Sequence, residues 1–334
     1  MKRSLTTAFK ILVTLVLFYY VFSRYGIRNV FDYLTNADII PLLLAVAIFL
    51  ASNFLGAMQW QLLLRGQKIN FPYSRAASLY FIGLFFNTVL PGSLGGDVVK
   101  VYSISRIERK GREGLAATFV DRFAGFFVLA LFAIAASIIL LSSPLLAGEG
   151  IKKDLLIYIA TIFSIFLFSI AIIFSRRVGK FIYEILLGGF NPLGLRDRFR
   201  ELHGFFHIYR DKHGLAVKVF LLSLAIQTAR VAVHFFCARA IGFEIDFLYF
   251  LLFVPLIAMA AVVPISFGGL GVRETLGPLL FTSVAAVAAV DPDGSLAMTT
   301  QLLASLVGIL VGLAGGVLFA AGRQTVVTSE IEET

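Results

Sequence analysis

Two stretches of the sequence carry residues suited to holding an anion within an otherwise apolar chain. The first reads Val89-Leu90-Pro91-Gly92-Ser93-Leu94-Gly95-Gly96-Asp97-Val98-Val99-Lys100. The second reads Val262-Val263-Pro264-Ile265-Ser266-Phe267-Gly268-Gly269-Leu270-Gly271-Val272-Arg273. Proline, serine, a Gly-Gly pair, valine and a final cation coincide without a gap, which indicates an internal repeat.

Each stretch predicts a broken helix. Proline removes a backbone donor and ends the helix before it, while glycine permits close backbone approach. A second half-helix then starts at 97–99 and at 272–273. Helix N-termini attract anions, and Lys100 and Arg273 each add a cation. We therefore expect an anionic or phosphate-bearing ligand, with Pro91 and Pro264 as the helix breaks. The predicted binding residues are Asn87, Ser93, Gly95, Gly96, Asp97, Lys100, Arg122, Ser266, Gly268, Gly269, Arg273 and Glu274.

Several of these residues have more than one interpretation. The two serines can bind the ligand or cap the half-helices. Asp97 and Glu274 can titrate, or they can pair with Lys100, Arg273 or Arg122. Charges within apolar segments are costly and are therefore functional candidates.

Three secondary candidates lie in other apolar runs: Asp121, Arg230 and His234. Arg230 and His234 are four residues apart and so share one helix face. They can line a site or form a hydrogen bond between helices. Arg122 can alternatively extend its side chain to the lipid headgroups.

The elements that position these residues are membrane helices. Of the 334 residues 59% are hydrophobic, and the mean hydropathy is +0.90. The apolar runs approach the ~20 residues that cross a bilayer, and they do not alternate as barrel strands do. This composition argues against a soluble enzyme. The net charge of +9 is typical of cytoplasmic loops and does not indicate nucleic-acid binding. A single cysteine, Cys237, can form neither an intrachain disulfide nor a metal site.

The predicted fold is an all-α polytopic membrane protein with about six full transmembrane helices and two broken re-entrant hairpins. The full spans are 8–23, 39–63, 115–141, 155–174, 215–238 and 296–321. The first has no small-residue cleavage site after it, so we expect an uncleaved span and not a signal peptide. The hairpins are 77–106 and 247–290, each interrupted by proline, glycine and charge.

The distribution of Lys and Arg orients these segments. Basic loops flank 77–106 on both sides, so this hairpin should enter from the cytoplasm and return. By the same reasoning 247–290 enters from outside, and both termini are cytoplasmic. Residues 1–154 and 155–323 then form two repeats of opposite orientation, as in many transporters. Residues 175–214 predict a basic amphipathic helix, either on the membrane surface or packed on the protein, and 324–334 predicts a disordered tail.

Motifs for the commoner catalytic sites are missing from the sequence. It contains no phosphate-binding Gly-x4-Gly-Lys-Ser/Thr loop, no His-Glu-x-x-His and no Gly-x-Ser-x-Gly. We therefore expect no enzymatic activity, no cofactor and no metal.

The residues 85–100, followed by Asp121-Arg122 and by 264–274, resemble the lysylphosphatidylglycerol synthase transmembrane, flippase-like family. The resemblance extends from about residue 8 to 321. It implies lipid translocation across a bacterial inner membrane. It also implies a stand-alone flippase-like region, without the cytoplasmic domain that makes the aminoacyl lipid in bifunctional members.

Taken together, these patterns predict translocation of an anionic or phosphate-bearing lipid between leaflets. The expected partners are membrane lipids with anionic headgroups, and an oligomer is compatible with the sequence. Two alternatives stay open. One is a secondary transporter of a soluble anion, and the other is a non-transporting membrane partner of a lipid-modifying or glycolipid-modifying enzyme.

Overall fold

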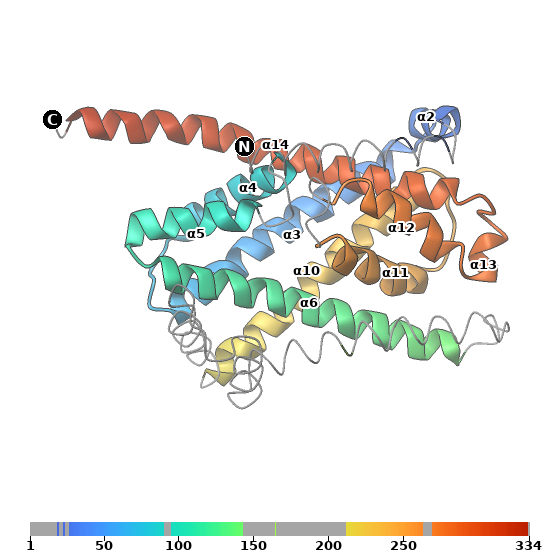
Figure 1. Cartoon of the computed structure of the whole chain (residues 1–334), viewed down its shortest axis with the longest axis horizontal. Helices are drawn as coiled ribbons and strands as arrows, with labels where there is room; N and C mark the ends of the chain where they lie inside the picture. The colour runs from blue at the N-terminus through green and yellow to red at the C-terminus, as the bar shows by residue number, and fades with distance from the viewer. Residues whose placement is uncertain are drawn as a thin grey trace, which may run out of the picture.

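The computed structural model describes residues 27–89, 95–142, 212–262 and 269–332, with the single positions 19, 23 and 164. Within these residues all the regular elements are helices (Figure 1), which confirms the all-α membrane fold. Four helices are long and apolar enough to cross a membrane: α3 (Ile39–Gly66), α6 (Gly111–Leu141), α10 (His213–Ala240) and α14 (Ser295–Glu332). They match four predicted spans. The spans predicted at 8–23 and 155–174, and the amphipathic segment predicted at 175–214, lie almost wholly outside the described residues.

The centre of the fold is the antiparallel pair α3 and α10, which run diagonally through the molecule in Figure 1. Hydrogen bonds join the pair at both ends. The Asp38 amide donates to the Ala240 carbonyl at 2.8 Å, and Lys212 Nζ donates to the Gly66 carbonyl at 2.7 Å. These two helices are the second spans of the two predicted halves, so the halves run in opposite directions.

The first predicted hairpin consists of α4 (Tyr73–Val89) and α5 (Gly95–Glu108), which pack against each other. Lys110, just after α5, donates to the carbonyl of Lys68, just before α4, at 2.9 Å. Both ends of the hairpin therefore lie at one end of the molecule. Inside it, a Cβ on Gly96 would overlap the Gly83 carbonyl, so this close approach requires glycine.

The second hairpin consists of α11 (Phe247–Ala260) and α12 (Val272–Phe281). Its open end lies beside the C-terminal end of α10, because the Phe281 ring packs 5.3 Å from Phe250 and 6.2 Å from Phe243. Figure 1 shows this pair at the end of the molecule opposite the turn between α5 and α6. The two hairpins thus enter from opposite ends.

Helix contacts in one half have counterparts in the other. α4 packs on α14 while α11 packs on α6, and α5 packs on α6 while α12 packs on α14. Likewise α3 contacts α4 and α6, while α10 contacts α11 and α14. Exchanging the halves leaves this contact pattern unchanged, as expected for an inverted repeat.

The remaining described elements lie near the start of α14. α2 (Ile27–Thr35) packs there through Val30 and Met298, and α13 (Ala285–Ala288) precedes the last loop. Asp291 caps α14, accepting the amides of Leu296 at 3.1 Å and Ala297 at 2.8 Å.

The far end of α14 departs from the sequence-based expectation. The helix continues to Glu332, into the tail 324–334 that we predicted as disordered. Adding residues to an existing helix needs no new nucleation, so a polar tail can extend a membrane helix.

Candidate functional site

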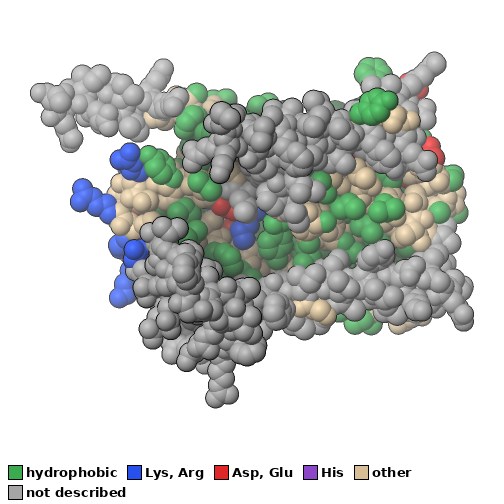
Figure 2. Space-filling view, viewed as in Figure 1, with side chains coloured by type: hydrophobic (Ala, Val, Ile, Leu, Met, Phe, Trp, Pro, Cys, Tyr) green, Lys and Arg blue, Asp and Glu red, His purple; other side chains and the backbone are tan. Residues whose placement is uncertain are grey.

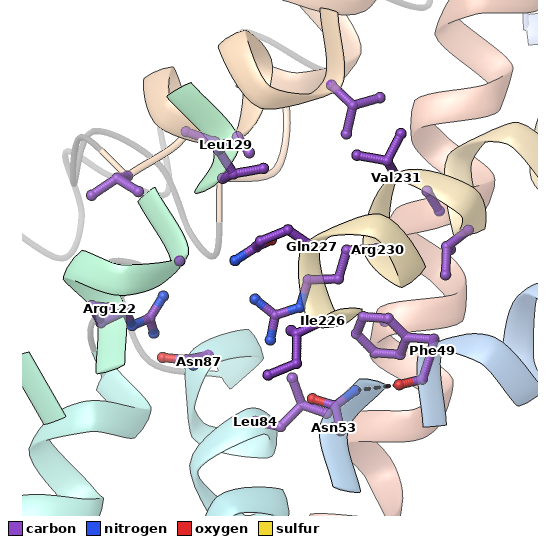
Figure 3. A pocket seen from close by; sticks show the side chains of 18 of the residues that line it. Phe49, Asn53, Leu84, Asn87, Arg122, Leu129, Ile226, Gln227, Arg230 and Val231 are labelled. Atoms are coloured by element: carbon purple, nitrogen blue, oxygen red, sulfur yellow. Dashed lines mark hydrogen bonds between the residues drawn. The ribbon is translucent and has the colours of Figure 1, made fainter. Parts of the chain in front are cut away.

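A cavity of about 290 Å³ lies between the two hairpins and the four long helices. Four basic side chains line it: Lys100 from α5, Arg122 from α6, Arg230 from α10 and Arg273 from α12. The structure therefore brings together cations that are far apart in the sequence. Figure 3 shows Arg122 and Arg230 directed toward the same space, with Asn87 and Gln227 at its margin.

Lys100 is held on one side of this cavity. Its Nζ lies 2.9 Å from Asp97, 4.8 Å from the centre of the Tyr80 ring and 5.3 Å from that of Trp60. Only 6% of the Lys100 side chain is exposed. A buried ammonium needs an anion or π-faces in place of water, and it has both here. Gly56 makes room for this arrangement, since a Cβ there would overlap the Tyr80 hydroxyl.

Asp97 pairs with both Lys100 and Arg122, two of the partners that the sequence left open. One carboxylate oxygen faces Lys100, and the other accepts from Arg122 Nε at 2.6 Å. The carboxylate thus ties α5 to α6 at the cavity wall. The Arg122 side chain keeps 31% exposure, so this pair is not sealed from the surroundings. Figure 2 shows acidic and basic side chains together midway along the visible face, apart from the charged ends.

Asp121 is a second carboxylate at the cavity, and it is buried. It accepts a hydrogen bond from Gln59 Nε2 at 3.0 Å, and Gln59 Oε1 in turn accepts from Ser223 at 2.9 Å. This chain links α6, α3 and α10 across the site. It fixes the orientation of the Gln59 side chain at the cavity wall.

The two half-helix starts use their free amides within the protein. Asn87 Oδ1 accepts from the Gly96 amide at 2.8 Å, and Glu274 accepts from the Gly271 amide at 2.7 Å. The other Glu274 oxygen accepts from Ser305 at 2.8 Å. Glu274 is therefore a buried helix cap and not a cavity residue. Each start thus has one amide bound within the protein, while the four side-chain cations line the cavity.

Arg273 and Arg230 differ from the first two cations. The Arg273 side chain forms no hydrogen bond or ion pair with the part of the chain that the structure describes, while its backbone amide donates to the Gly269 carbonyl at 3.3 Å. Arg230 lies 3.5 Å from the Tyr80 hydroxyl, and its Nε is buried without a partner among the described residues. His234 Nδ1 lies 3.0 Å from the Arg230 carbonyl, in the same helix, so it does not bridge two helices through this nitrogen.

The remaining predicted site residues lie beside the cavity or outside the described part. Gly95 begins α5 and Gly96 packs on Gly83, while Gly269 has a positive φ of 79° that favours glycine. The others fall outside the described residues: Pro91, Ser93, Pro264, Ser266 and Gly268.

Several cavity residues were not predicted, namely Asn53, Tyr80, Ser223 and Gln227. A signal for two of them was present in the sequence. Ser223, Gln227, Arg230 and His234 recur at helical spacing and form a polar stripe along one face of the apolar α10. Tyr80 carried no comparable signal, because a tyrosine in an apolar run fits packing equally well.

Comparison with known proteins agrees with this architecture. The family model described as "Lysylphosphatidylglycerol synthase TM region" matches residues 7–316. The chain belongs to this family. A UPF0104 membrane protein of Pyrococcus horikoshii is 27% identical over 351 aligned positions, covering 98% of this chain and 100% of the relative. Another, from Methanothermobacter thermautotrophicus, is 23% identical, covering 83% of this chain and 84% of the relative. The resemblance noted in the motifs is confirmed, and the protein is an integral membrane protein of a lipid-related family.

Proposed function

We propose that the protein translocates an anionic or phosphate-bearing lipid between the leaflets of the cell's inner, or plasma, membrane. The cavity between oppositely oriented hairpins carries the proposal, because four cations from both halves line it. Sites of this kind, near the interface of inverted repeats, are typical of transporters. In this proposal the protein moves the lipid without changing its covalent bonds.

A second feature favours a lipid over a soluble anion. An aliphatic groove runs between α3 and α14, and it shares Ile309 with the cation-lined cavity. Its described lining includes Leu42, Leu43, Val46 and Leu310. A headgroup in the cavity and acyl chains in this groove would each meet a matching surface. At the boundary, Gly308 faces the Phe49 ring and leaves room there.

Charge distribution supports an orientation. Exposed Lys and Arg side chains gather at the end where α3 and α5 finish and α6 and α10 begin, as Figure 2 shows at its left. They are Arg65, Lys68, Arg106, Arg109, Arg112 and Lys212. By the positive-inside rule we place this end in the cytoplasm. α14 runs toward the same end, so the C-terminus is then cytoplasmic, and Lys2, Arg3 and Lys10 extend the same orientation to the N-terminus.

The test is leaflet exchange of fluorescent phosphatidylglycerol and phosphatidylcholine in proteoliposomes. The purified protein should accelerate exchange of the anionic lipid, and Lys100→Ala/Arg273→Ala should lose most of that acceleration. Arg239→Ala is the matched control. Arg239 is a cation on α10 like Arg230, but it is 40% exposed and pairs with Glu244 at 3.4 Å, away from the cavity.

Exchange no faster than in empty liposomes, with or without a proton gradient, would refute translocation of these lipids. Exchange that is equally fast in the double variant would leave translocation standing and reject the cavity as its site. Uptake of radiolabelled phosphate without lipid exchange would instead support a transporter of soluble anions.

A further inference from the structure

The four cavity cations fall into two classes by their partners. Lys100 and Arg122 share the Asp97 carboxylate at 2.9 and 2.6 Å, so their charges have an anion in contact. Asp121 adds a further carboxylate to the same side of the cavity. The α5–α6 side therefore carries nearly balanced charge.

On the opposite side the two cations have no anion in contact. In the described residues neither Arg230 nor Arg273 has a carboxylate within 4.0 Å. Glu274, next to Arg273 in sequence, acts on Arg273 through its charge, but its oxygens accept from the Gly271 amide and the Ser305 hydroxyl and do not contact the guanidinium. Within the described residues, the Arg230 side chain has only the long 3.5 Å contact with the Tyr80 hydroxyl, and its buried Nε has no partner there.

These two guanidinium groups also repel. Besides the negative charge of the adjacent Glu274, Arg273 experiences the positive charges of Arg230 and Arg122 across the cavity. Like charges at the edge of an apolar interior are costly without an anion between them. The segments that close the hairpins, 90–94 and 263–268, contain no acidic residue and cannot supply it.

We infer that the missing anion is a doubly charged phosphate group on the ligand, that is, a phosphomonoester or a diphosphate. Each guanidinium presents a planar fork that binds phosphate oxygens in pairs, so two of them match two negative charges. A headgroup bearing amines, such as the lysyl group of lysylphosphatidylglycerol, would place cations against Arg230 and Arg273. This inference rests on the proposed function and specifies its substrate class.

The test compares lipids that share dioleoyl chains and differ in headgroup charge. The four lipids are phosphatidic acid, phosphatidylglycerol, phosphatidylcholine and lysylphosphatidylglycerol. Each is titrated at pH 8 into the full chain in detergent, and the bound fraction is measured by native mass spectrometry. Glycerol 3-phosphate, a soluble phosphomonoester, provides a further arm. The phosphomonoester of phosphatidic acid can accept a further set of charged hydrogen bonds from a guanidinium group. We therefore expect phosphatidic acid to bind at least about tenfold more tightly than phosphatidylglycerol.

Variants locate the effect. Arg230→Gln and Arg273→Gln should each reduce the preference for phosphatidic acid about tenfold, while Arg239→Gln on the same α10 leaves it unchanged. The fluorescence of Trp60, the single tryptophan, checks that the surroundings of Lys100 are unchanged in the variants, because its ring centre lies 5.3 Å from Lys100 Nζ. Equal binding of phosphatidic acid and phosphatidylglycerol, or tighter binding of the lysyl lipid, would overturn the inference.

The outcomes separate this inference from the proposed function. Leaflet exchange without any preference among headgroups supports translocation and overturns the doubly charged ligand. A preference for phosphatidic acid without exchange supports the phosphate site and overturns translocation. Glycerol 3-phosphate that binds as tightly as phosphatidic acid supports the phosphate chemistry and overturns the lipid as its source.

Discussion

Replacing Asp97 by asparagine should destabilise the protein, because this one carboxylate is in contact with two cations. The Lys100 side chain is 6% exposed and that of Asp97 12%, so their 2.9 Å pair lies in a low-dielectric setting. Removing one member of such a pair typically costs about 3–5 kcal/mol. Arg122 is 31% exposed, so solvent screening limits its share to about 1 kcal/mol or less. The Tyr80 and Trp60 rings still stabilise the ammonium, so we expect a loss of about 3 kcal/mol.

Unfolding in mixed detergent and denaturant, followed by tryptophan fluorescence, measures this loss. The single tryptophan is Trp60, whose ring centre lies 5.3 Å from Lys100 Nζ, so the reporter is at the site. A double-mutant cycle with Lys100→Met isolates the pair from other effects of each substitution. We expect a coupling energy of at least about 1.5 kcal/mol. A loss below about 1 kcal/mol for Asp97→Asn, or costs that simply add in the double variant, would refute the argument.

Three further predictions test other parts of the fold. Gly96→Ala should lower the unfolding free energy by about 3 kcal/mol and reduce the yield of detergent-solubilised protein, because the new Cβ overlaps the Gly83 carbonyl, and backbone atoms move less easily than a side chain. An unfolding free energy close to that of the wild type would contradict this packing. Among the described residues only Phe49 comes near a Cβ placed on Gly308, at 3.9 Å, so Gly308→Trp should fill this space and slow lipid exchange by at least about tenfold, while Gly308→Ala should not. Equal rates would reject the aliphatic groove between α3 and α14 as the path of the acyl chains. Asp291→Ala should lower the unfolding free energy by about 1–2 kcal/mol through loss of the α14 cap, and an unchanged midpoint in a denaturant titration would count against the cap.

The sequence predicted the membrane fold because hydrophobic length is a local property. The spans at 39–63, 115–141, 215–238 and 296–321 appear as α3, α6, α10 and α14, which begin or end within a few residues of the prediction. The four cations of the cavity could also be predicted as candidate site residues, since a charge inside an apolar run is costly and is therefore a functional candidate.

The hydrogen-bond and ion-pair partners of the buried carboxylates could not be predicted from the sequence, because they depend on which helices face one another. Asp97 and Glu274 follow similar glycine-rich breaks, yet Asp97 bridges two cations whereas Glu274 caps its own helix and meets Ser305. The difference arises from what α6 and α14 present at those points, an arginine in one and a serine in the other. Tyr80 and Asn53 entered the site for the same reason, through tertiary packing that no local pattern encodes.

The matching helix contacts of the two halves bear on energetics as well as architecture. If the halves exchanged their conformations, the same contacts would form again and the cavity would open toward the other leaflet, so no new interface has to be created. The repeats are not identical, however, because Asp97 in the first motif corresponds to Leu270 in the second. In the described residues the bridge from Asp97 on α5 to Arg122 on α6 therefore has no counterpart between α12 and α14. In the proposed transport cycle this bridge would favour the conformation described here, and a ligand that competed for Arg122 would weaken that preference.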